Sequence, residues 1–214
     1  MIRTYKYKLY DTKRLKHLNQ RVEIAGIIYN HCIALHKRYY KLFGKSLNKF
    51  QLQKHLTKLK KLPRYSFWKI VPSQAIQEIT DRIDKAYKLF FRNQKQDIKS
   101  SPPSFKKVKR YKSITLKQAR YKIDGNVISL GGYKFKFWLS RPIIGKIKTI
   151  TIKRDNIGDF YICIALEQEE TKESITSGKI VGIDFGLKTF LTPLDNTKVK
   201  SPQCKDCGAE KFLI

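Results

Sequence analysis

Acidic residues are scarce in this 214-residue chain, which has 17 aspartates and glutamates against 46 lysines and arginines and a formal net charge of +29. Such an excess is far beyond what solubility requires, and it indicates a polyanionic partner such as a nucleic acid. Residues 1–100 hold 24 basic and 6 acidic residues, residues 101–154 hold 15 and 1, and residues 155–214 hold 7 and 10. We expect the nucleic-acid-binding surface before residue 155 and a different domain after it.

Long apolar runs and cysteines are also few. No segment approaches the roughly 18 consecutive apolar residues of a membrane span, and the first residues lack the apolar core of a signal peptide. The four cysteines do not make a disulfide framework, and Cys32 and Cys163 lie isolated in apolar surroundings. We therefore predict a cytoplasmic protein with no membrane partner, in which these two cysteines are small core residues.

Hydrophobic periodicity predicts three helices that form a small basic bundle. In the first, apolar residues recur every three or four positions over residues 15–42, with Asp11 and Thr12 signalling the start and Gly44 the end. A second, strongly basic helix is predicted at about residues 47–62, before Pro63. A third begins after Pro72 with Ser73 as its cap. Its apolar stripe comprises Ile76, Ile79, Ile83, Tyr87, Phe90 and Phe91, and its polar face comprises Asp81, Arg82, Asp84, Lys85 and Lys88.

Alternating residues predict strands on either side of these helices. In residues 2–9, Tyr5, Tyr7 and Leu9 face one side while Lys6 and Lys8 face the other. After a breaker at residues 99–109, further strands are predicted at residues 113–117, 120–124, 126–130, 133–139, 146–154 and 159–167. This spacing predicts a small antiparallel barrel or meander.

Lysines and aromatic residues alternate on one of these strands. Lys134 and Lys136 alternate with Tyr133, Phe135 and Phe137. Two interpretations follow: the rings stack on bases while the lysines bind phosphates, or the rings fill the interior and only the lysines touch the partner. We favour the second.

The candidate nucleic-acid-binding residues are lysines and arginines of the basic helices, the segment after them and the strands. They are Lys6, Lys8, Arg38, Lys54, Lys58, Lys61, Arg64, Lys106, Lys107, Lys109, Arg110, Lys112, Lys134, Lys136, Lys146 and Lys148.

One carboxylate stands at the end of an apolar run close to the end of the chain. Residues 180–183 predict a strand buried on both faces, followed by Asp184 between Gly182 and Gly186, and residues 189–194 and 197–200 are expected to complete a hairpin. A carboxylate in that position suits Mg²⁺ or Mn²⁺. Hydrolysis by two metal ions needs several carboxylates, however, and an Asp-x-Gly after a strand also forms a simple turn. The motif alone leaves both interpretations open.

A second motif lies at residues 204–208, Cys-Lys-Asp-Cys-Gly. It has the spacing of half a zinc knuckle, in which Cys204 and Cys207 are candidate Zn²⁺ ligands, but tetrahedral zinc needs four ligands and no other Cys or His has a matching spacing. Three explanations remain: a remnant joined by internal deletion, a chance pair in a frameshifted tail, or a pair completed by a second chain. We favour the first.

The order of these modules resembles the N-terminal half of the TnpB (OrfB) family, which comprises insertion-sequence-encoded RNA-guided nucleases related to miniature type V CRISPR effectors. The resemblance extends to about residue 203. It is carried by RTYKYKLY at residues 3–10, PSQAIQ at 72–77, AYKLFFR at 86–92, PSFK at 103–106, RPIIGKIK at 141–148 and GIDFG at 182–186.

This resemblance implies a multidomain α+β fold. Residues 1–10 and 101–176 would form an OB-like antiparallel wedge barrel, and residues 11–100 a helical, helix-turn-helix-like recognition domain inserted into it. Residues 178–214 would begin a RuvC-like domain of the RNase H type, which is incomplete here.

The resemblance also implies the partners, which are a guide RNA from the mobile element and a matching target DNA. Asp184 matches the first of three catalytic carboxylates that bind Mg²⁺ or Mn²⁺ in the family, and Cys204 and Cys207 match one half of its zinc ribbon. The other two carboxylates have no matching positions here, and Glu210 is too close to Asp184 in sequence to replace one of them.

We therefore predict a truncated TnpB-like protein that binds nucleic acid but does not hold Mg²⁺ productively and is not independently catalytic. One alternative is a working metal-dependent, RNA-guided DNA endonuclease completed by another chain. The other is a non-catalytic DNA- or RNA-binding regulator whose affinity falls steeply with salt.

Overall fold

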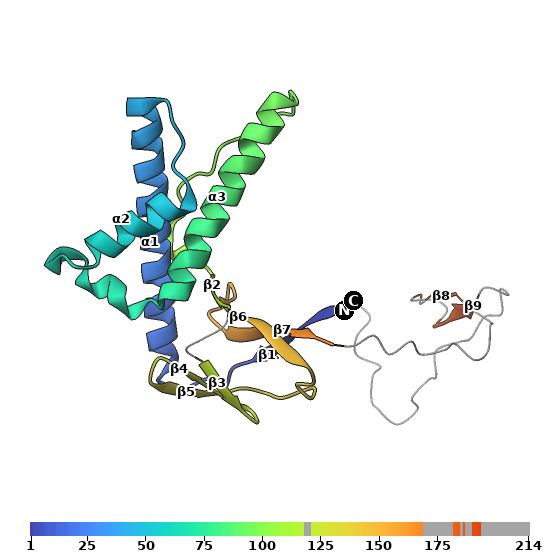
Figure 1. Ribbon diagram of the computed structural model, residues 1–214. Helices are drawn as coiled ribbons and strands as arrows, with labels where there is room; N and C mark the ends of the chain where they lie inside the picture. Colours follow the sequence, from blue (N-terminus) through green and yellow to red (C-terminus); the bar gives the residue numbers. More distant parts are fainter. Residues whose placement is uncertain (118–120, 169–181, 185, 187–189, 194–214) are drawn as a thin grey trace, which may run out of the picture. The chain divides into compact units, whose positions relative to one another are not determined.

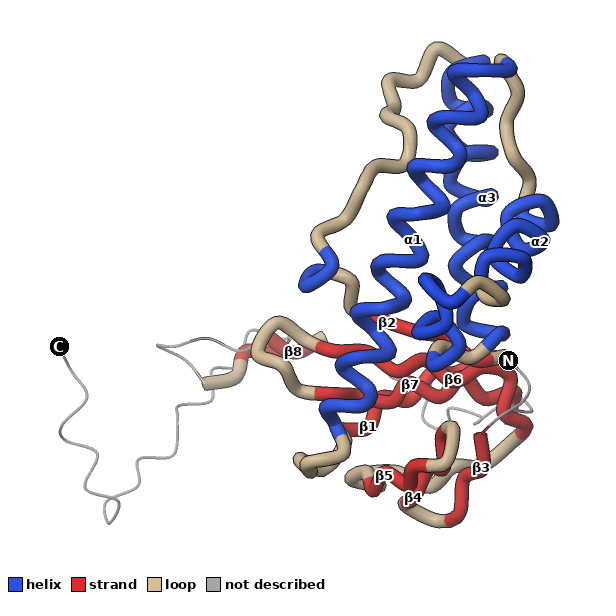
Figure 2. Tube along the Cα trace, turned by 90° about the vertical axis from the view of Figure 1, so that its left-hand side faces the viewer, coloured by secondary structure: helices blue, strands red, loops and turns tan. Residues whose placement is uncertain are grey.

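The computed structural model describes residues 1–117, 121–168, 182–184, 186 and 190–193. The chain divides into two compact units, Met1–Glu170 and Thr171–Ile214. The first unit contains three long helices and two antiparallel sheets (Figures 1 and 2). The predicted α+β class with antiparallel strands is therefore confirmed.

The first helix, α1 (Leu15–Phe43), has the predicted length but a different start. Asp11 and Thr12 were expected to begin it, yet the helix starts at Leu15 and Arg14 provides no side-chain cap. Thr12 contributes only its backbone carbonyl, which accepts a hydrogen bond from the Leu15 N–H at 2.9 Å. The end is as predicted, because Gly44 takes a left-handed φ of 63° and donates its N–H to the Tyr40 carbonyl.

The second helix, α2 (Lys49–Leu59), is shorter than the predicted range. It begins with a capping box, in which the Asn48 side chain accepts from the Gln51 N–H and the Gln51 side chain accepts from the Asn48 N–H, each at 2.9 Å. After it, Pro63 opens a 3₁₀ helix, η1 (Pro63–Ile70), that periodicity did not predict. This helix buries Trp68 against the core.

The third helix, α3 (Ser73–Lys95), follows Pro72 as predicted. Ser73 is its first residue, not its cap, since no side-chain cap hydrogen bond is made there. The predicted polar face of this helix is also wrong at one position, because Asp84 is buried. Its carboxylate forms an ion pair with Lys88 at 2.8 Å.

The strands form two sheets in the first unit. The four-stranded sheet has the order β1 (Ile2–Lys8), β7 (Phe160–Glu167), β6 (Lys146–Arg154) and β2 (Ser113–Leu116). The three-stranded sheet has the order β3 (Tyr121–Asp124), β4 (Val127–Leu130) and β5 (Tyr133–Lys136). An isolated bridge between Leu9 and Phe137 links the chain beyond β1 to the chain beyond β5. A short 3₁₀ helix, η2 (Val108–Arg110), precedes β2.

The period of two separates buried from exposed side chains in the strands. Phe135 is buried on β5 and Phe137 is 0% exposed, whereas Lys134 and Lys136 are exposed. The interpretation that these rings lie inside is therefore confirmed. Tyr133 differs, since it is half-buried and stacks on His17 of α1 with ring centroids 4.3 Å apart.

The two isolated cysteines have different surroundings. Cys32 is fully buried in α1, and burial raises the pKa of its thiol to about 12, so the prediction of a core residue is confirmed. Cys163 is only half-buried, because it alternates along β7 with the buried Ile162 and Ile164. The core prediction for Cys163 is wrong.

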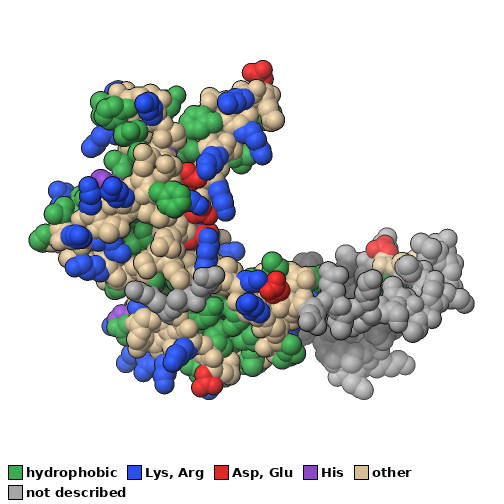
Figure 3. Space-filling model, viewed as in Figure 1, with side chains coloured by type: hydrophobic (Ala, Val, Ile, Leu, Met, Phe, Trp, Pro, Cys, Tyr) green, Lys and Arg blue, Asp and Glu red, His purple; other side chains and the backbone are tan. Residues whose placement is uncertain are grey.

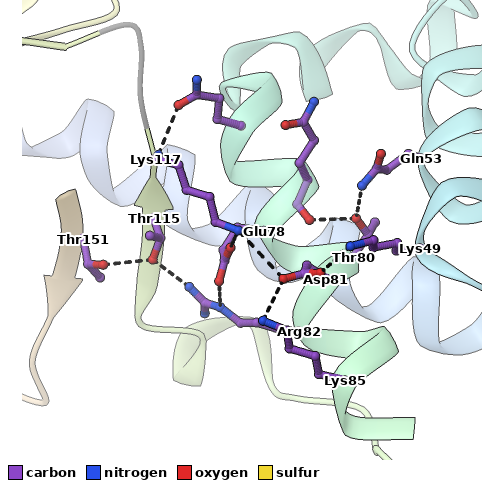
Figure 4. Close-up of polar contacts among 12 residues, drawn as sticks. Lys49, Gln53, Glu78, Thr80, Asp81, Arg82, Lys85, Thr115, Lys117 and Thr151 are labelled. Carbon is purple, nitrogen blue, oxygen red and sulfur yellow. Dashed lines mark hydrogen bonds and ion pairs between the residues drawn. The ribbon is translucent and has the colours of Figure 1, made fainter. Parts of the chain in front are cut away.

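A polar network joins α3 to α2 and β2 (Figure 4). Lys117 pairs with Glu78 at 2.8 Å, and Arg82 donates to the Thr115 hydroxyl at 2.8 Å. Partial burial disfavours the charged form of Asp81, but ion pairs with Lys85 and Lys49 outweigh this effect and hold its pKa below the usual range. The carboxylates of α3 are thus neutralised by lysines from their own helix and from its neighbours.

The second unit contributes one strand pair. β8 (Ile183–Asp184) pairs antiparallel with β9 (Thr192–Pro193). Ile183 is 52% exposed, so the prediction of a strand buried on both faces is wrong for the part that is described. β9 lies in the first range predicted to complete the hairpin. Residues 197–200, Cys204, Cys207 and Glu210 lie outside the described residues.

None of the described helices has an apolar stretch long enough to cross a membrane.

Candidate nucleic-acid interface

The predicted cations all lie in the first unit and, apart from the half-buried Lys112, all are exposed. On the face shown in Figure 3, lysines and arginines are spread over both the helices and the sheets, and acidic side chains are few. The exposed cations fall into three groups, on α2 and η1, on the segment before β2, and on the strands.

The first group follows from helical geometry. Lys54 and Lys58 are four residues apart on α2, so they share a face, and Leu52 and Leu56 are buried on another. Arg64 is exposed on η1, where its guanidinium lies 5.8 Å from the Tyr65 ring centroid. Arg38 on α1 is exposed as well.

The second group surrounds a hollow of about 760 Å³. Lys109, Arg110 and Lys112 line it together with Arg154 from β6. The Arg154 guanidinium, 9% exposed, donates to the carbonyls of Lys109 at 2.9 Å and Tyr111 at 3.3 Å. It thereby holds in place the backbone that carries the exposed cations.

Arg154 also reaches α1, where its guanidinium donates to Asn19 and lies 3.5 Å from Glu23. Sequence reasoning missed this residue, although a signal was present. Arg154 is in phase with Ile150 and Ile152 along β6, and both of those are buried.

The third group lies on the strands and is partly neutralised. Lys8 pairs with Asp159, and Lys148 pairs with Glu167 at 2.7 Å, which holds the pKa of Glu167 below its usual range. Lys6 lies over the Tyr161 ring, 3.9 Å from its centroid.

Within the part of the chain that the structure describes, Lys134 and Lys136 form no ion pair. Like Lys146, which is also exposed and in none of these pairs, they can offer their positive charge to a phosphate.

Exposed aromatic rings are a feature that sequence reasoning missed. Trp138 is 61% exposed, and its ring centroid lies 6.1 Å from that of Tyr10, which is also exposed. Backbone hydrogen bonds place this pair beside the strand cations, because the Trp138 N–H donates to the Lys8 carbonyl and the Tyr10 N–H to the Lys136 carbonyl. Rings next to cations suit bases and phosphates of a single strand.

Metal ligation by Asp184 stays a prediction. This residue lies exposed at the end of β8. Among the described residues, no three or more His, Cys, Asp or Glu side chains are placed to hold a metal ion. A single exposed carboxylate does not fit the several oxygen ligands that a two-metal nuclease site requires.

Comparison with known proteins finds a relative of this chain. No protein-family model matches the sequence. A curated protein of Escherichia coli (strain K12), described as "Putative RNA-guided DNA endonuclease InsQ", is 26% identical over 176 residues, which is 79% of this chain and 41% of that protein. The predicted resemblance to the TnpB/OrfB family is thereby confirmed. The chain spans less than half the length of the curated relative it matches.

A solved structure is also similar to this chain. The "Cryo-EM structure of the Cas12f1-sgRNA-target DNA complex" contains a chain with a TM-score of 0.46 and 13% identity, over 95% of this chain and 55% of that one.

Proposed function

We propose that this chain is a nucleic-acid-binding, transposon-associated protein of the TnpB/OrfB type that binds a guide RNA and, through it, a target DNA. The observation that carries the proposal is the array of exposed cations on the helices, the segment before β2 and the strands of the first unit. The curated relative, described as an RNA-guided DNA endonuclease, supports the choice of partners.

The proposal assigns a role to each part of the chain. The two sheets, linked by the bridge between Leu9 and Phe137, would correspond to the wedge barrel of residues 1–10 and 101–176. The helices of residues 11–100 would form the recognition domain, and residues 178–214 would begin the RuvC-like domain.

Cleavage by this chain alone is not part of the proposed function. In the described residues, Asp184 stands on an exposed strand end and belongs to no group of three or more metal-ligating side chains. A catalytic role for Asp184 would require further carboxylates from elsewhere.

Filter binding tests the proposal. The full chain is titrated with the element-derived RNA, with a scrambled RNA of equal length and with double-stranded DNA, each at two salt concentrations. We expect the tightest binding to the element-derived RNA and a marked loss of affinity at the higher salt, because neutralised phosphates release counterions. Equal affinity for the scrambled RNA would contradict guided recognition.

The double variant Lys134→Ala/Lys136→Ala tests the strand surface, with Lys85→Ala/Lys88→Ala as the matched control, since both control lysines pair with carboxylates of α3. We expect the first pair to reduce the salt dependence and the control to leave it nearly unchanged. In a separate reaction with Mg²⁺, guide RNA and matched DNA, guided cleavage that Asp184→Ala abolishes would overturn the claim that the chain does not cleave on its own.

A further inference from the structure

We propose that a groove between the C-terminal halves of α1 and α3 binds an unpaired nucleobase of the RNA partner. In Figures 1 and 2 both helices run away from the sheets and end on the same side of the first unit. The groove lies between these ends and has a volume of about 280 Å³. It is lined by His36, Lys37, Tyr40, Tyr87, Phe90, Phe91, Gln94 and Pro102.

The floor of the groove is rigid and aromatic. His36 and Tyr87 are buried and stack with ring centroids 3.6 Å apart and planes 7° apart. The His36 imidazole is also held by the Ser46 hydroxyl, which lies 3.0 Å from its Nε2 atom. A planar ligand would therefore meet an ordered aromatic surface, which keeps the entropic cost of binding small.

The wall on α1 offers an exposed ring on which a base can stack. Tyr40 on α1 is 50% exposed, and its centroid lies 6.3 Å from that of Phe91 on α3. A volume of about 280 Å³ is close to the lower limit of small-molecule sites, about 300 Å³. One base or nucleoside fits that size, whereas a helix or a strand of another protein does not.

The charge around the groove selects an anionic ligand. The lining contains the exposed Lys37 and no carboxylate, and the last turns of the two helices add the exposed basic residues Lys41, Arg92 and Lys95. The Gln94 side chain supplies amide groups of the kind that read the edge of a base. Rings for stacking, cations for phosphate and an amide for the base edge are together the requirements of single-stranded recognition.

A second copy of the chain is a weaker candidate for this groove. Leu42 and Phe43 extend the exposed apolar surface at the end of α1. A symmetric contact here, however, would bring together the cations of two chains that each carry a net charge of +29. Like charges at an interface oppose association, and the same charges attract RNA.

The inference rests on the proposed function, and its test separates the two. A short single-stranded RNA carrying one 2-aminopurine is titrated with the full chain, and the quenching of its fluorescence reports stacking. We expect wild type and Tyr40→Phe to quench, and Tyr40→Ala to lose quenching and to bind at least about 5-fold more weakly, since stacking contributes about 1–3 kcal/mol per base. The same RNA in a duplex should not be quenched.

Phe50→Ala is the matched control, because Phe50 is 68% exposed on α2 and does not line the groove. If Tyr40→Ala binds and quenches like Phe50→Ala while wild type still binds RNA, the groove is not a base site and the proposed function stands. If wild type binds no RNA, the proposed function fails. A Tyr40→Ala variant that turns a dimer into a monomer without changing RNA binding would show that a second copy occupies the groove, which would overturn the inference.

Discussion

The strand β5 and the end of α1 place their aromatic rings in opposite ways. On β5 and beyond it, Phe135 and Phe137 point inward and the alternating lysines point outward. At the end of α1, Tyr40 and Phe43 are exposed. A strand of period two sorts side chains along its whole length, whereas the last turns of the 29-residue α1 leave these rings in solvent. The rings of β5 and Phe137 thus stabilise the fold, and those at the end of α1 are available to a ligand.

The largest expected effect is the loss of a ring from the sheets. Phe137→Ala removes a fully buried ring whose centroid lies 5.4 Å from that of Tyr7, and we expect the free energy of unfolding to fall by about 3–5 kcal/mol in urea titrations. Phe43→Ala removes a ring that is 61% exposed and should change this free energy by less than about 0.5 kcal/mol. Similar losses for both variants would break the comparison.

The next effect concerns the buried cation of the sheets. Arg154→Met leaves the carbonyls of Lys109 and Tyr111 without their donor, so we expect a loss of about 2–4 kcal/mol. Arg82→Met on α3 is the helical counterpart. The Arg82 side chain is 39% exposed, so water can replace its hydrogen bonds more readily. The same urea titrations should show a smaller loss of unfolding free energy for Arg82→Met than for Arg154→Met. An Arg82→Met loss as large as that of Arg154→Met would contradict this ranking.

A pH effect is expected to act on the helices. The Nε2 atoms of His31 on α1 and His55 on α2 lie 3.2 Å apart. Burial lowers the pKa of both imidazoles. The nearby charges of His55 and Arg38 lower the pKa of His31 further, and the charge of Lys58 lowers the pKa of His55 further. Since their folded pKa values lie below the ordinary value of 6.5, the unfolded chain takes up more protons as pH falls below that value. The stability is therefore present above pH 6.5 and lost on acidification.

Thermal unfolding between pH 7.5 and pH 5 measures this effect, with His31→Gln/His55→Gln as the test variant. We expect the variant to be less sensitive to acid than wild type. Hydrogen exchange at pH 5 should show α2 losing protection before the sheets. Equal loss in both regions would assign the acid sensitivity to other groups.

The smallest effect is expected at the exposed ion pair of the strands. Asp159→Asn removes the partner of Lys8, and because both side chains are exposed we expect no measurable change in stability. Asp84→Asn on α3 is the counterpart, and it should cost measurable stability because its carboxylate is buried. Circular dichroism melts compare the two. A larger loss for Asp159→Asn would reverse the expected order.

Periodicity predicted the elements well because it reflects burial, which is a property of each element's own sequence. The long stripe of α1 and the alternation of β5 to β7 are examples. It failed where a tertiary contact decided the outcome. Asp84 was assigned to a polar face because the sequence does not show how deeply that turn of α3 is buried. The 3₁₀ helix η1 was missed because its residues show no hydrophobic periodicity, although Pro63 begins it.

The candidate interface was predictable in its charges but not in its shape. The predicted cations follow from composition and helical faces, and those that were named as candidates lie in the first unit. The groove of Tyr40, Phe90 and Phe91 brings together residues from α1 and α3 that are 50 positions apart, and its ring stripe was interpreted as core. A hydrophobic stripe does not reveal that its last turn lacks a covering element.

The pairing of β1 with β7 has a consequence for the order in which the chain acquires structure. Tyr7 on β1 pairs with Ile162 on β7, so the first strand to be synthesised waits for one of the last strands of its unit. During synthesis at about 5–20 residues per second, α1 to α3 would emerge and pack while β1 remains without its neighbour. The segment synthesised first thus closes the sheet last, and for several seconds its unpaired edge is open to other chains.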